Sequence, residues 1–437
     1  MTASRRTLDR EIFALAIPTF ATLVSEPLLL LADSAIVGHL GTDQLAGLGI
    51  ASNVLGVLIG LSIFLAYGTT GSVARRLGAG DRVGALTAGF DGMVLAVLVG
   101  VGLTVLLQAV LEPVVGLYDV SPVVAEQART YLRIAAFGLP GVLLTLASTG
   151  VLRGLQDTRT PLYVVIATNL ANVGLNLLLV YGVGLGIAGS ALGTLIAQGS
   201  AALVLAAVVV RGMRRSHAPL HFRPGGVLGA ARTGVWLVLR TAALQTGITL
   251  TTFVAAGFGA VALAAHQVSV SIWTLLAFAL DAVAIAGQAI IGRTLGAGDV
   301  ALGRAMTRRM MGWGILFGLV FGAALVLARP LYVGLFSPDP AVQALLSQVL
   351  VVMALATPIA GVVFVLDGVL IGAGDGRYLA LAGLIALLAY VPAALVVQHT
   401  GAGLVWLWVA YGWYVAARML TLLWRIRGSA WMRTGAV

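Results

Sequence analysis

The sequence contains no cysteine, no lysine and few charged residues of any kind. The absence of cysteine excludes a disulfide framework and metal sites built on thiolates. Charged residues make up only 10% of the 437 residues, whereas soluble proteins contain about 25%. Hydrophobic residues make up 60%, and the mean hydropathy is +1.03. This composition excludes an ordinary soluble protein and predicts an all-α integral membrane protein.

Long apolar stretches predict twelve transmembrane helices, because a spanning helix needs roughly 20 mostly apolar residues. The expected spans are residues 10–38, 45–74, 84–110, 124–152, 160–182, 186–210, 232–256, 261–291, 302–328, 341–371, 377–397 and 403–426. The first apolar run continues past Asp33 without a cleavage pattern, so we expect a first span and no cleaved signal peptide.

The basic residues, all of them arginine, indicate how the chain is oriented in the membrane. Of the 26 arginines, 21 lie in the termini and in one alternate set of loops, while the other loops hold only Arg129, Arg133 and Arg329. Arginine-rich loops face the cytoplasm. We therefore expect a multi-pass protein of the inner (plasma) membrane with both termini in the cytoplasm. The same placement argues against a nucleic-acid partner despite the net charge of +10.

An internal repeat divides the chain into two halves. Arg75 and residues 77–81 match Arg293 and residues 295–299, and the same offset of 218 positions pairs Pro140 with Pro358. We expect an N-lobe at residues 1–212, a cytoplasmic linker at 213–231 and a C-lobe at 232–437. Six spans per half predict two six-helix bundles related by a pseudo-two-fold axis along the membrane normal, with a substrate site between them near the midplane, as in many transporters.

The repeated Leu-Gly-Ala-Gly-Asp loops at residues 77–81 and 295–299 allow two interpretations. They have the composition of tight turns flanked by arginine. Alternatively, their charged residues form a gating ion pair across the two halves.

Two acidic residues in the first span, Glu26 and Asp33, are the predicted proton or cation coupling site. Charges near the bilayer centre are unfavourable and are therefore candidates for function. The two residues are seven positions apart, so they lie within about 20° of one helix face and roughly 10 Å apart. Carboxyl groups in a low-dielectric medium take up protons readily. Pro18 and Pro27 interrupt the same helix and predict a bend there.

Polar residues in the fourth and fifth spans are candidates for a substrate cavity. Asn169, Asn172 and Asn176 follow one another at spacings of three and four, so they share a face of the fifth span. They could line a polar cavity or join helices by hydrogen bonds. Tyr131 in the fourth span could line the same cavity or pack against other aromatic residues.

Asp281 and Asp367 form a possible second polar site in the C-terminal half. Each could carry a cation or pair with Arg240 or a backbone donor. Asp91, near one end of the third span, is expected to be structural. The histidines show no metal-ligand spacing, and no phosphate-binding loop, HExxH or GxSxG motif is present. We therefore expect no cofactor, no metal site and no enzyme activity, and transport driven by an ion gradient.

Specific motifs give the chain a family resemblance. Residues 27–40 (PLLLLADSAIVGHL) resemble the first-helix motif of the MATE multidrug and toxin extrusion transporters, in particular the DinF-like branch. Residues 150–161 (GVLRGLQDTRTP) are similar to the loop after the fourth helix of that family. Residues 280–281 and 366–368 also look DinF-like, and the resemblance covers essentially the whole chain.

The resemblance implies two bundles around a central cavity and export of amphipathic, often cationic compounds in exchange for protons or sodium. By this resemblance Asp33 matches the N-lobe acid whose protonation is proposed to bend the first helix near Pro18. Tyr131, Asn172 and Asn176 match positions that line the same cavity. Many relatives carry aspartate where this chain has Asn176. Our hypothesis is that Glu26 supplies the second carboxylate from within the first helix.

Other functional classes fit less well. A flippase for lipid-linked precursors is the main alternative, but such proteins often carry an arginine-rich cavity, and the spans here hold only Arg240 and Arg418. A membrane enzyme would need a nucleophile, base or metal cluster, and a channel would need a ring of selectivity ligands. We expect a monomer whose partners are small amphipathic molecules and the lipid bilayer. Few convergent oxygens favour H⁺ over Na⁺ as the coupling ion.

Overall fold

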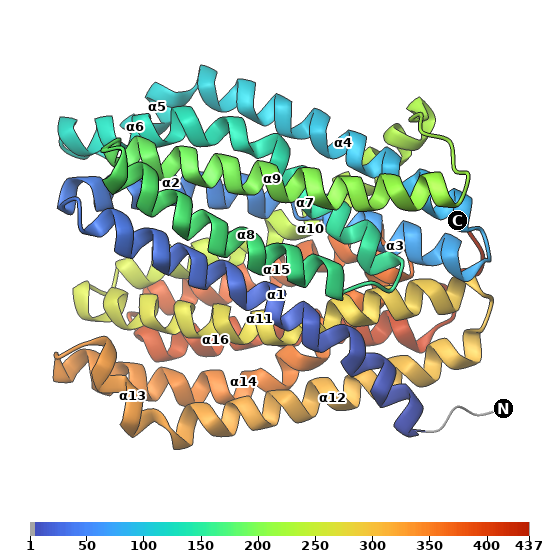
Figure 1. Cartoon of the computed structure of the whole chain (residues 1–437). Coiled ribbons are helices and arrows are strands. Elements are labelled where there is room, and N and C mark those ends of the chain that lie inside the picture. The colour runs from blue at the N-terminus through green and yellow to red at the C-terminus, as the bar shows by residue number, and fades with distance from the viewer. Residues whose placement is uncertain (1–4, 437) are drawn as a thin grey trace. The chain divides into compact units, whose positions relative to one another are not determined.

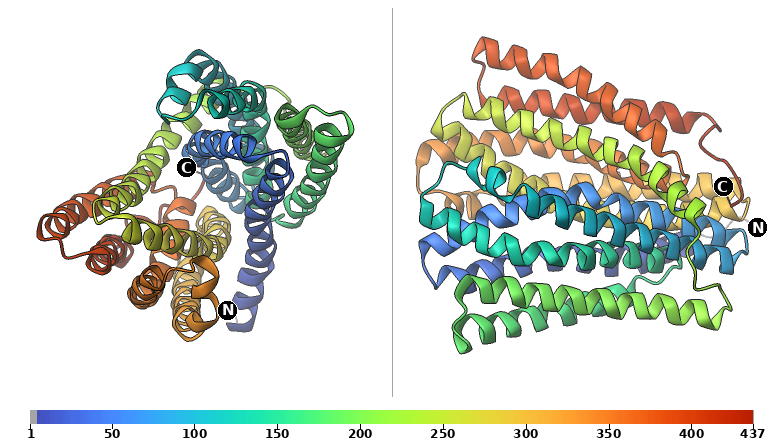
Figure 2. Two further views of the ribbon diagram at one scale, coloured as in Figure 1. Left: turned by 90° about the vertical axis from the view of Figure 1, so that its left-hand side faces the viewer. Right: turned by 90° about the horizontal axis from the view of Figure 1, so that it is seen from above.

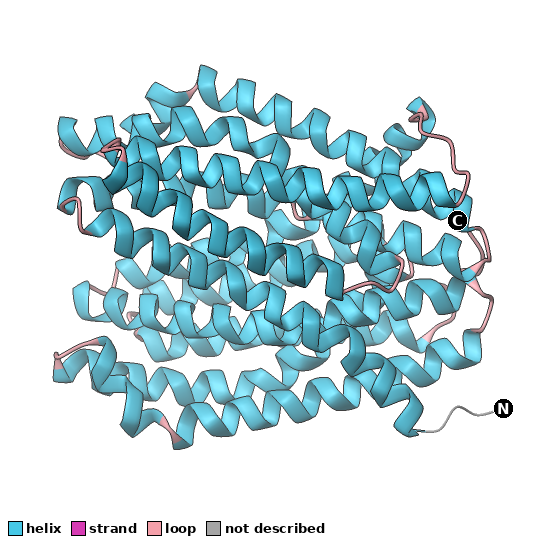
Figure 3. Cartoon of the chain, viewed as in Figure 1, coloured by secondary structure: helices cyan, strands magenta, loops and turns pink. Residues whose placement is uncertain are grey.

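The computed structural model describes residues 5–436, and these form helices joined by short turns, with no strand among them (Figures 1 and 3). Eleven of the described helical segments are long and apolar enough to cross a membrane. The twelfth expected span corresponds to α16 (Leu404–Arg427), whose aromatic residues and Arg418 make it less apolar. The all-α membrane fold expected from the composition is confirmed.

Contacts between residues divide the described chain into two units of six long spans each. We call residues 17–234 the N-unit, and residues 5–16 with 235–435 the C-unit. Within each unit the long helices lie side by side (Figure 2). The N-unit contains most of α1 (Arg5–Gly38), α2 (Thr42–Ser62), α3 (Phe64–Gly78), α4 (Arg82–Ala109), α5 (Leu111–Gly116), α6 (Pro122–Ala135), the 3₁₀ turn η1 (Ala136–Gly138), α7 (Leu139–Gly154), α8 (Arg159–Leu177), the π-helix η2 (Leu178–Gly182) and α9 (Gly186–Arg215).

The C-unit repeats this order with fewer interruptions. It contains most of α10 (Pro224–Ala256), with α11 (Ala260–Gly296), α12 (Val300–Leu327), α13 (Arg329–Phe336), α14 (Pro340–Gly372), α15 (Gly376–Thr400) and α16. The short helices α5 and α13 begin 218 positions apart, at the end of matching spans. Where the N-unit breaks its second span at Ile63, the C-unit has the continuous helix α11.

The repeated Leu-Gly-Ala-Gly-Asp loops are tight turns, as one interpretation of the sequence predicted. Gly80 and Gly298 have φ of 80° and 79°, a region that favours glycine. The Asp81 side chain accepts a hydrogen bond from the Gly84 N–H at 2.7 Å, and Asp299 caps α12 in the same way. The acidic residue of each loop therefore stabilises the start of the next helix.

Close helix packing explains why glycine and proline recur at the same offset. α4 packs against α7, and α12 packs against α14. A Cβ added at Gly100 would lie 2.5 Å from the Pro140 Cα, and one at Gly318 would lie 2.5 Å from the Pro358 Cα. Small residues let helix backbones approach closely where lipid provides no hydrophobic drive for association. The repeat thus preserves two equivalent backbone crossings.

Helices α1 and α10 each divide between the two units. The described part of α1 up to Ala16 belongs to the C-unit, and α10 up to Gly234 belongs to the N-unit. Val227, Ala230 and Ala231 of α10 pack against the buried N-unit cluster around Leu143 and Val151. The two breaks fall 218 positions apart, so the repeat includes this exchange of helix starts.

Ion pairs of opposite polarity hold these two helix starts. In the C-unit, Arg309 of α12 donates twice to the Asp9 carboxylate of α1, at 2.6 Å each, and the Trp313 indole donates to it at 2.8 Å. In the N-unit, Arg223, just before α10, donates to the Asp91 carboxylate of α4 through its backbone N–H at 2.8 Å and through its guanidinium. Asp91, which is 1% exposed, therefore has the structural role expected of it.

We predict that Gly100→Ala destabilises the protein. Because the added Cβ would overlap the Pro140 backbone, α4 and α7 must separate, and overpacking of this kind lowers the free energy of unfolding by about 1–3 kcal/mol. Thermal unfolding in detergent should show a lower Tm. Gly102→Ala is the matched control, since a Cβ there meets no atom within 4 Å. Equal Tm values for the two variants would contradict the predicted close crossing.

Candidate functional site

A chain of hydrogen bonds in the N-unit joins α1, α8 and α9. The Asn172 Nδ2 donates to the Thr194 Oγ1 at 3.0 Å, and the Asn172 Oδ1 accepts from the Asn176 Nδ2 at 3.0 Å. The Asn176 Nδ2 also donates to the Asp33 Oδ1 at 2.7 Å. Of the three predicted asparagines, Asn176 therefore binds the predicted acid directly, and Asn172 is joined to it through Asn176.

Tyr131 of α6 completes this group. Its phenol lies within interaction range of the Asp33 carboxylate and of the hydroxyls of Ser190 and Thr194 on α9. We refer to the residues in the following list as the Asp33 cluster: Asp33, Tyr131, Asn172, Asn176, Ser190 and Thr194. Asp33 and Tyr131 are each 4% exposed, and both asparagines are fully buried. Residues from four helices thus form one polar group that includes this acid.

Local backbone features make room for the cluster. A Cβ added at Gly193 of α9 would lie 2.0 Å from the Asn176 Oδ1, so only glycine at this position leaves space for that amide. Just after Asn176, α8 passes into the π-helix η2, a form that is rare and is frequently found at functional sites. Tyr181 within η2 donates to the Ile36 carbonyl of α1 at 2.5 Å, which fixes α8 against α1 next to Asp33.

Among the described residues, the Asp33 carboxylate forms no salt bridge, and the buried Asn176 oxygen accepts no hydrogen bond. Among residues 5–436, no cationic side chain forms a salt bridge with Asp33; the strongest donor to its carboxylate is the neutral Asn176 amide. The Asn176 Oδ1 is buried and has no hydrogen-bond partner. A carboxylate held by neutral groups in a low-dielectric setting is suited to binding a proton or a small cation.

The structure separates Glu26 and Asn169 from this cluster. Asn169 donates to the Ser25 carbonyl of α1 at 3.0 Å and so joins α8 to α1 by a helix–helix hydrogen bond. Glu26 is an exposed residue of α1, and among the described residues no hydrogen bond joins its side chain to that of Asp33. The two acids therefore share a helix without contact between their side chains.

The two residues predicted to bend the first span, Pro18 and Pro27, lie inside the continuous helix α1. Between them the Thr22 hydroxyl donates to the Pro18 carbonyl at 2.9 Å, and the Ser25 hydroxyl donates to the Ala21 carbonyl at 2.7 Å. Proline removes a backbone donor, and hydroxyl bonds to the carbonyl four residues earlier favour bending. This segment follows directly on Ala16, where α1 passes from the C-unit to the N-unit.

The C-unit carries a different polar group around Asp367. Arg240 of α10 donates to the Asp367 Oδ2 at 2.6 Å, and Arg418 of α16 donates to the same oxygen. Asp367 is 4% exposed and Arg240 is 9% exposed. Of the roles considered for Asp367, the structure therefore shows the pairing with Arg240. Two arginines around one aspartate leave a net charge of +1, which does not favour a further cation. Asp281 is half-buried on α11.

The position that matches Asp33 in the C-unit has no acid. Thr251 stands 218 positions after Asp33, and Tyr390 stands 218 positions after Asn172. Their hydroxyls are 2.6 Å apart, so the same helix pair is joined by a neutral hydrogen bond. Tyr390 belongs to an aromatic group with Tyr411 and Tyr414. The scaffold is repeated, whereas the unbalanced carboxylate belongs to the N-unit alone among these matched positions.

Sequence reasoning missed Ser190, Gly193 and Thr194. These small residues lie on α9, whose composition of glycine, alanine, serine and threonine is common in packed membrane helices. The available signal was that Ser190 precedes Gly193 by three positions and Thr194 by four, which places it on the same side of the helix as both. Among the described residues, no group of three or more histidine or acidic side chains could hold a metal ion.

Comparison with known proteins agrees with this fold. A family model described as MatE matches residues 18–178 and again residues 237–396, once in each half of the chain. The chain belongs to the MatE family. The resemblance noted in the sequence is therefore confirmed, and the double match agrees with the internal repeat.

Curated relatives place this MatE protein among multidrug efflux transporters and not among enzymes. The chain is 29% identical to Protein DETOXIFICATION 44, chloroplastic, of Arabidopsis thaliana, over 96% of this chain and 82% of that protein. It is 28% identical to DNA damage-inducible protein F of Escherichia coli, over 84% of this chain and 81% of that protein. These matches favour efflux over the flippase alternative.

Solved structures share the fold of the MatE protein. A MOP superfamily transporter from Pyrococcus furiosus superposes with a TM-score of 0.88 at 22% identity, covering 98% of this chain and 97% of that one. A crystal structure of MATE in the bent conformation superposes with a TM-score of 0.89 at 22% identity, covering all of both chains. The two six-helix halves are therefore those of a MATE transporter fold.

We predict that Gly193→Ala abolishes export by displacing Asn176. The added Cβ would overlap the Asn176 Oδ1, so the amide must rotate away and the hydrogen bond to Asp33 must break. Drug efflux from cells that express the protein measures the loss. Gly199→Ala on the same helix is the matched control, because a Cβ there meets no atom within 4 Å. Full efflux by Gly193→Ala at normal expression would contradict the role given to Asn176.

Proposed function

We propose that this protein is a secondary active antiporter that exports amphipathic, often cationic compounds in exchange for protons by alternating access. The observation that supports the proposal is the Asp33 carboxylate, which is 4% exposed and held by the neutral Asn176 amide. Such a group changes its charge when a proton binds, and its neighbours must respond to that change. The sequence contains no phosphate-binding loop, which agrees with energy from an ion gradient.

Proton uptake would change the hydrogen bonds of the Asp33 cluster. The ionised carboxylate accepts from the Asn176 Nδ2, whereas a protonated carboxyl group also offers an O–H donor. The Asn176 Oδ1 is buried and lacks a hydrogen-bond partner, so it is an acceptor for this O–H. We propose that movement of α1 brings the protonated Asp33 carboxyl group to the Asn176 Oδ1. Protonation would then shift α1 relative to α8.

Helix α1 is the element that would carry this shift. Its N-unit part is joined to α8 at Ser25, Asp33 and Ile36. Its first turns are held in the C-unit by the Asp9 and Glu11 ion pairs with Arg309 and Arg293. Pro18 lies between the Glu11 and Ser25 contacts, and this is the part of α1 that can bend. Proton binding at Asp33 would then change the path of a helix that is shared by both units.

The proposal extends to the coupling ion, the membrane and the substrate. The Asp33 cluster presents a single carboxylate, and the oxygens of Asn172 and Thr194 already accept hydrogen bonds within the cluster, which favours H⁺ over Na⁺. The arginine-rich loops support insertion into the inner (plasma) membrane with both termini in the cytoplasm. We further propose that Tyr131 contacts the aromatic part of a substrate and that the protein works as a monomer.

We expect Asp33→Asn to abolish proton-driven export, because asparagine cannot bind and release a proton. The measurement is accumulation of ethidium in everted membrane vesicles, with a pH gradient or a sodium gradient imposed alone. The wild type should respond to the pH gradient, and Asp33→Asn should fall to the level of vesicles without the protein. Asp43→Asn, at an exposed position at the start of α2, should transport normally. Accumulation driven by sodium at zero pH gradient would overturn the assignment of H⁺.

The same vesicles test the proposed role of Glu26 as a second carboxylate. If Glu26 shares the proton chemistry, Glu26→Gln should reduce pH-driven accumulation and change its pH dependence. Normal transport by Glu26→Gln beside an inactive Asp33→Asn would assign the coupling to Asp33 alone.

We also predict that the start of α1 must leave α12 during transport. The chain has no cysteine, so Asp9→Cys and Arg309→Cys can be joined selectively by a short, reducible bifunctional thiol reagent. The joined protein should lose transport and regain it on reduction, because α1 can no longer move at this anchor. Each single cysteine variant treated with the reagent is the control. Undiminished transport by the fully joined protein would show that this anchor stays closed throughout the cycle.

A further inference from the structure

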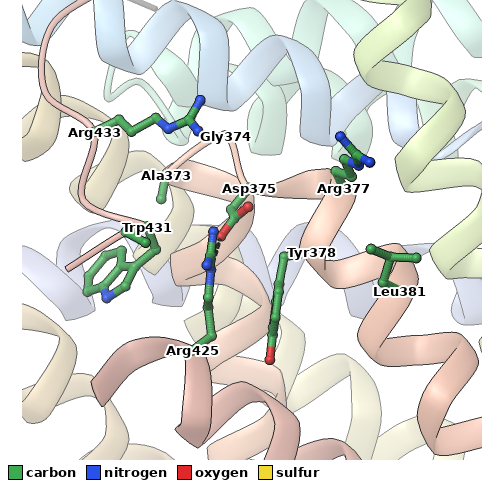
Figure 4. Close-up of a pocket in the computed structure, with 10 residues that line it drawn as sticks. Ala373, Gly374, Asp375, Arg377, Tyr378, Leu381, Arg425, Trp431 and Arg433 are labelled. Carbon is green, nitrogen blue, oxygen red and sulfur yellow. Dashed lines mark hydrogen bonds and ion pairs between the residues drawn. The ribbon is translucent and has the colours of Figure 1, made fainter. Parts of the chain in front are cut away.

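A cavity of about 370 Å³ lies in the C-unit, and none of its lining residues belongs to the Asp33 cluster. It is formed by the turn between α14 and α15, the end of α16 and the segment that follows α16 (Figure 4). Its lining is Ala373, Gly374, Asp375, Arg377, Tyr378, Leu381, Arg425, Ala430, Trp431 and Arg433. Nothing in the transport mechanism proposed above uses these residues.

The charge of the lining is strongly positive. Three arginines and one aspartate give it a net charge of +2. Arg425 donates to the Asp375 carboxylate at 2.6 Å and lies over the Tyr378 ring at 4.8 Å. Arg377 and Arg433 lie on either side of this pair, as Figure 4 shows. The single acid is therefore engaged by Arg425, while the Arg377 guanidinium lies over the Trp236 ring at 5.6 Å and Arg433 also lines the cavity.

Asp375 differs from the matching residue in the N-unit. Asp157, 218 positions earlier, accepts hydrogen bonds from the N–H groups of Arg159 and Thr160 at the start of α8. Asp375 forms no such cap on α15, because its carboxylate pairs with Arg425. The first turn of α15, which lines the cavity through Arg377 and Tyr378, thus adds its N-terminal partial positive charge to that of the arginines.

The segment after α16 is an ordered wall of the cavity. Trp431 is 2% exposed, and its indole donates to the Ile426 carbonyl at 3.4 Å. Further along, the Gly435 N–H donates to the Leu295 carbonyl at 3.1 Å. These contacts hold Arg433 beside the turn at Gly374. The opposite part of the lining includes Leu381, an apolar side chain on α15 that is 46% exposed.

We propose that this cavity binds the phosphate group of an anionic ligand, namely the headgroup of an anionic phospholipid. Guanidinium groups form strong charge-assisted hydrogen bonds with phosphate oxygens, and basic pockets at the ends of membrane helices bind lipid headgroups. A lipid fits better than soluble phosphate because the cavity lies at the ends of α14, α15 and α16. The exposed Leu381 on α15 offers an apolar surface to acyl chains.

Binding of dioleoylphosphatidylglycerol to the detergent-purified full-length protein tests this assignment. Native mass spectrometry should show that this lipid is retained in preference to dioleoylphosphatidylcholine. Arg377→Gln and Arg433→Gln should each weaken retention about tenfold, since each removes a charge-assisted hydrogen bond. Arg377→Lys should retain part of the binding, because it keeps the charge. Arg427→Gln is the matched control, since Arg427 is exposed on the last turn of α16 and does not line the cavity.

Thermal unfolding separates lipid binding from loss of the fold. Without added lipid, Arg427→Gln should have the same Tm as the wild type. Phosphatidylglycerol should raise the Tm of the wild type and of Arg427→Gln above their lipid-free values, but it should not raise that of Arg433→Gln. Equal retention by the Arg377→Gln/Arg433→Gln double variant, or no preference over phosphatidylcholine, would overturn the proposal. Stabilisation by inorganic phosphate at matched ionic strength, without any by phosphatidylglycerol, would show that a lipid is the wrong source of the phosphate.

Discussion

The hydrogen bond from the Asn176 amide to the Asp33 carboxylate is the interaction on which the N-unit is organised. A charge inside a membrane is tolerated only when polar groups surround it, and here those groups are neutral. This requirement accounts for the glycine at position 193, which leaves space for the amide. It also accounts for the polar group that residues from α1, α6, α8 and α9 form around this acid. Because the Asn176 amide is neutral, the net charge of the site would depend on whether Asp33 is protonated.

The internal repeat shows which features belong to the scaffold and which to chemistry. The crossings at Gly100 and Gly318, and the capped turns at Asp81 and Asp299, occur in both units because they hold helices together. The polar groups differ. The N-unit has an unbalanced carboxylate at Asp33, whereas the C-unit neutralises Asp367 with two arginines. Breaking that buried group would leave uncompensated charge in the membrane, which is strongly destabilising.

The exchange of helix starts connects the two units mechanically. Because α1 and α10 each pass from one unit to the other, neither unit holds all of its own first span. The anchoring ion pairs have opposite polarity, with an acid on α1 in one case and an arginine beside α10 in the other. Asp91 and Arg309 stand 218 positions apart, so these two equivalent positions carry opposite charges, whereas their partners Arg223 and Asp9 do not match at that offset. The bend proposed near Pro18 would change the direction of a helix that both units share.

The sequence by itself determined the membrane class, the spans and the repeat, and it selected Asp33, Asn172 and Asn176, which the structure joins by hydrogen bonds. These features follow from local properties: hydropathy, spacing along a helix and the rarity of charge in apolar segments. Only the tertiary structure decided that Asn169 binds a backbone carbonyl, that Asp367 is neutralised and that Gly193 shapes the site. It also revealed the exchange of helix starts. The physical reason is that a side chain's role depends on the atoms opposite it, and those atoms come from helices far away in the chain.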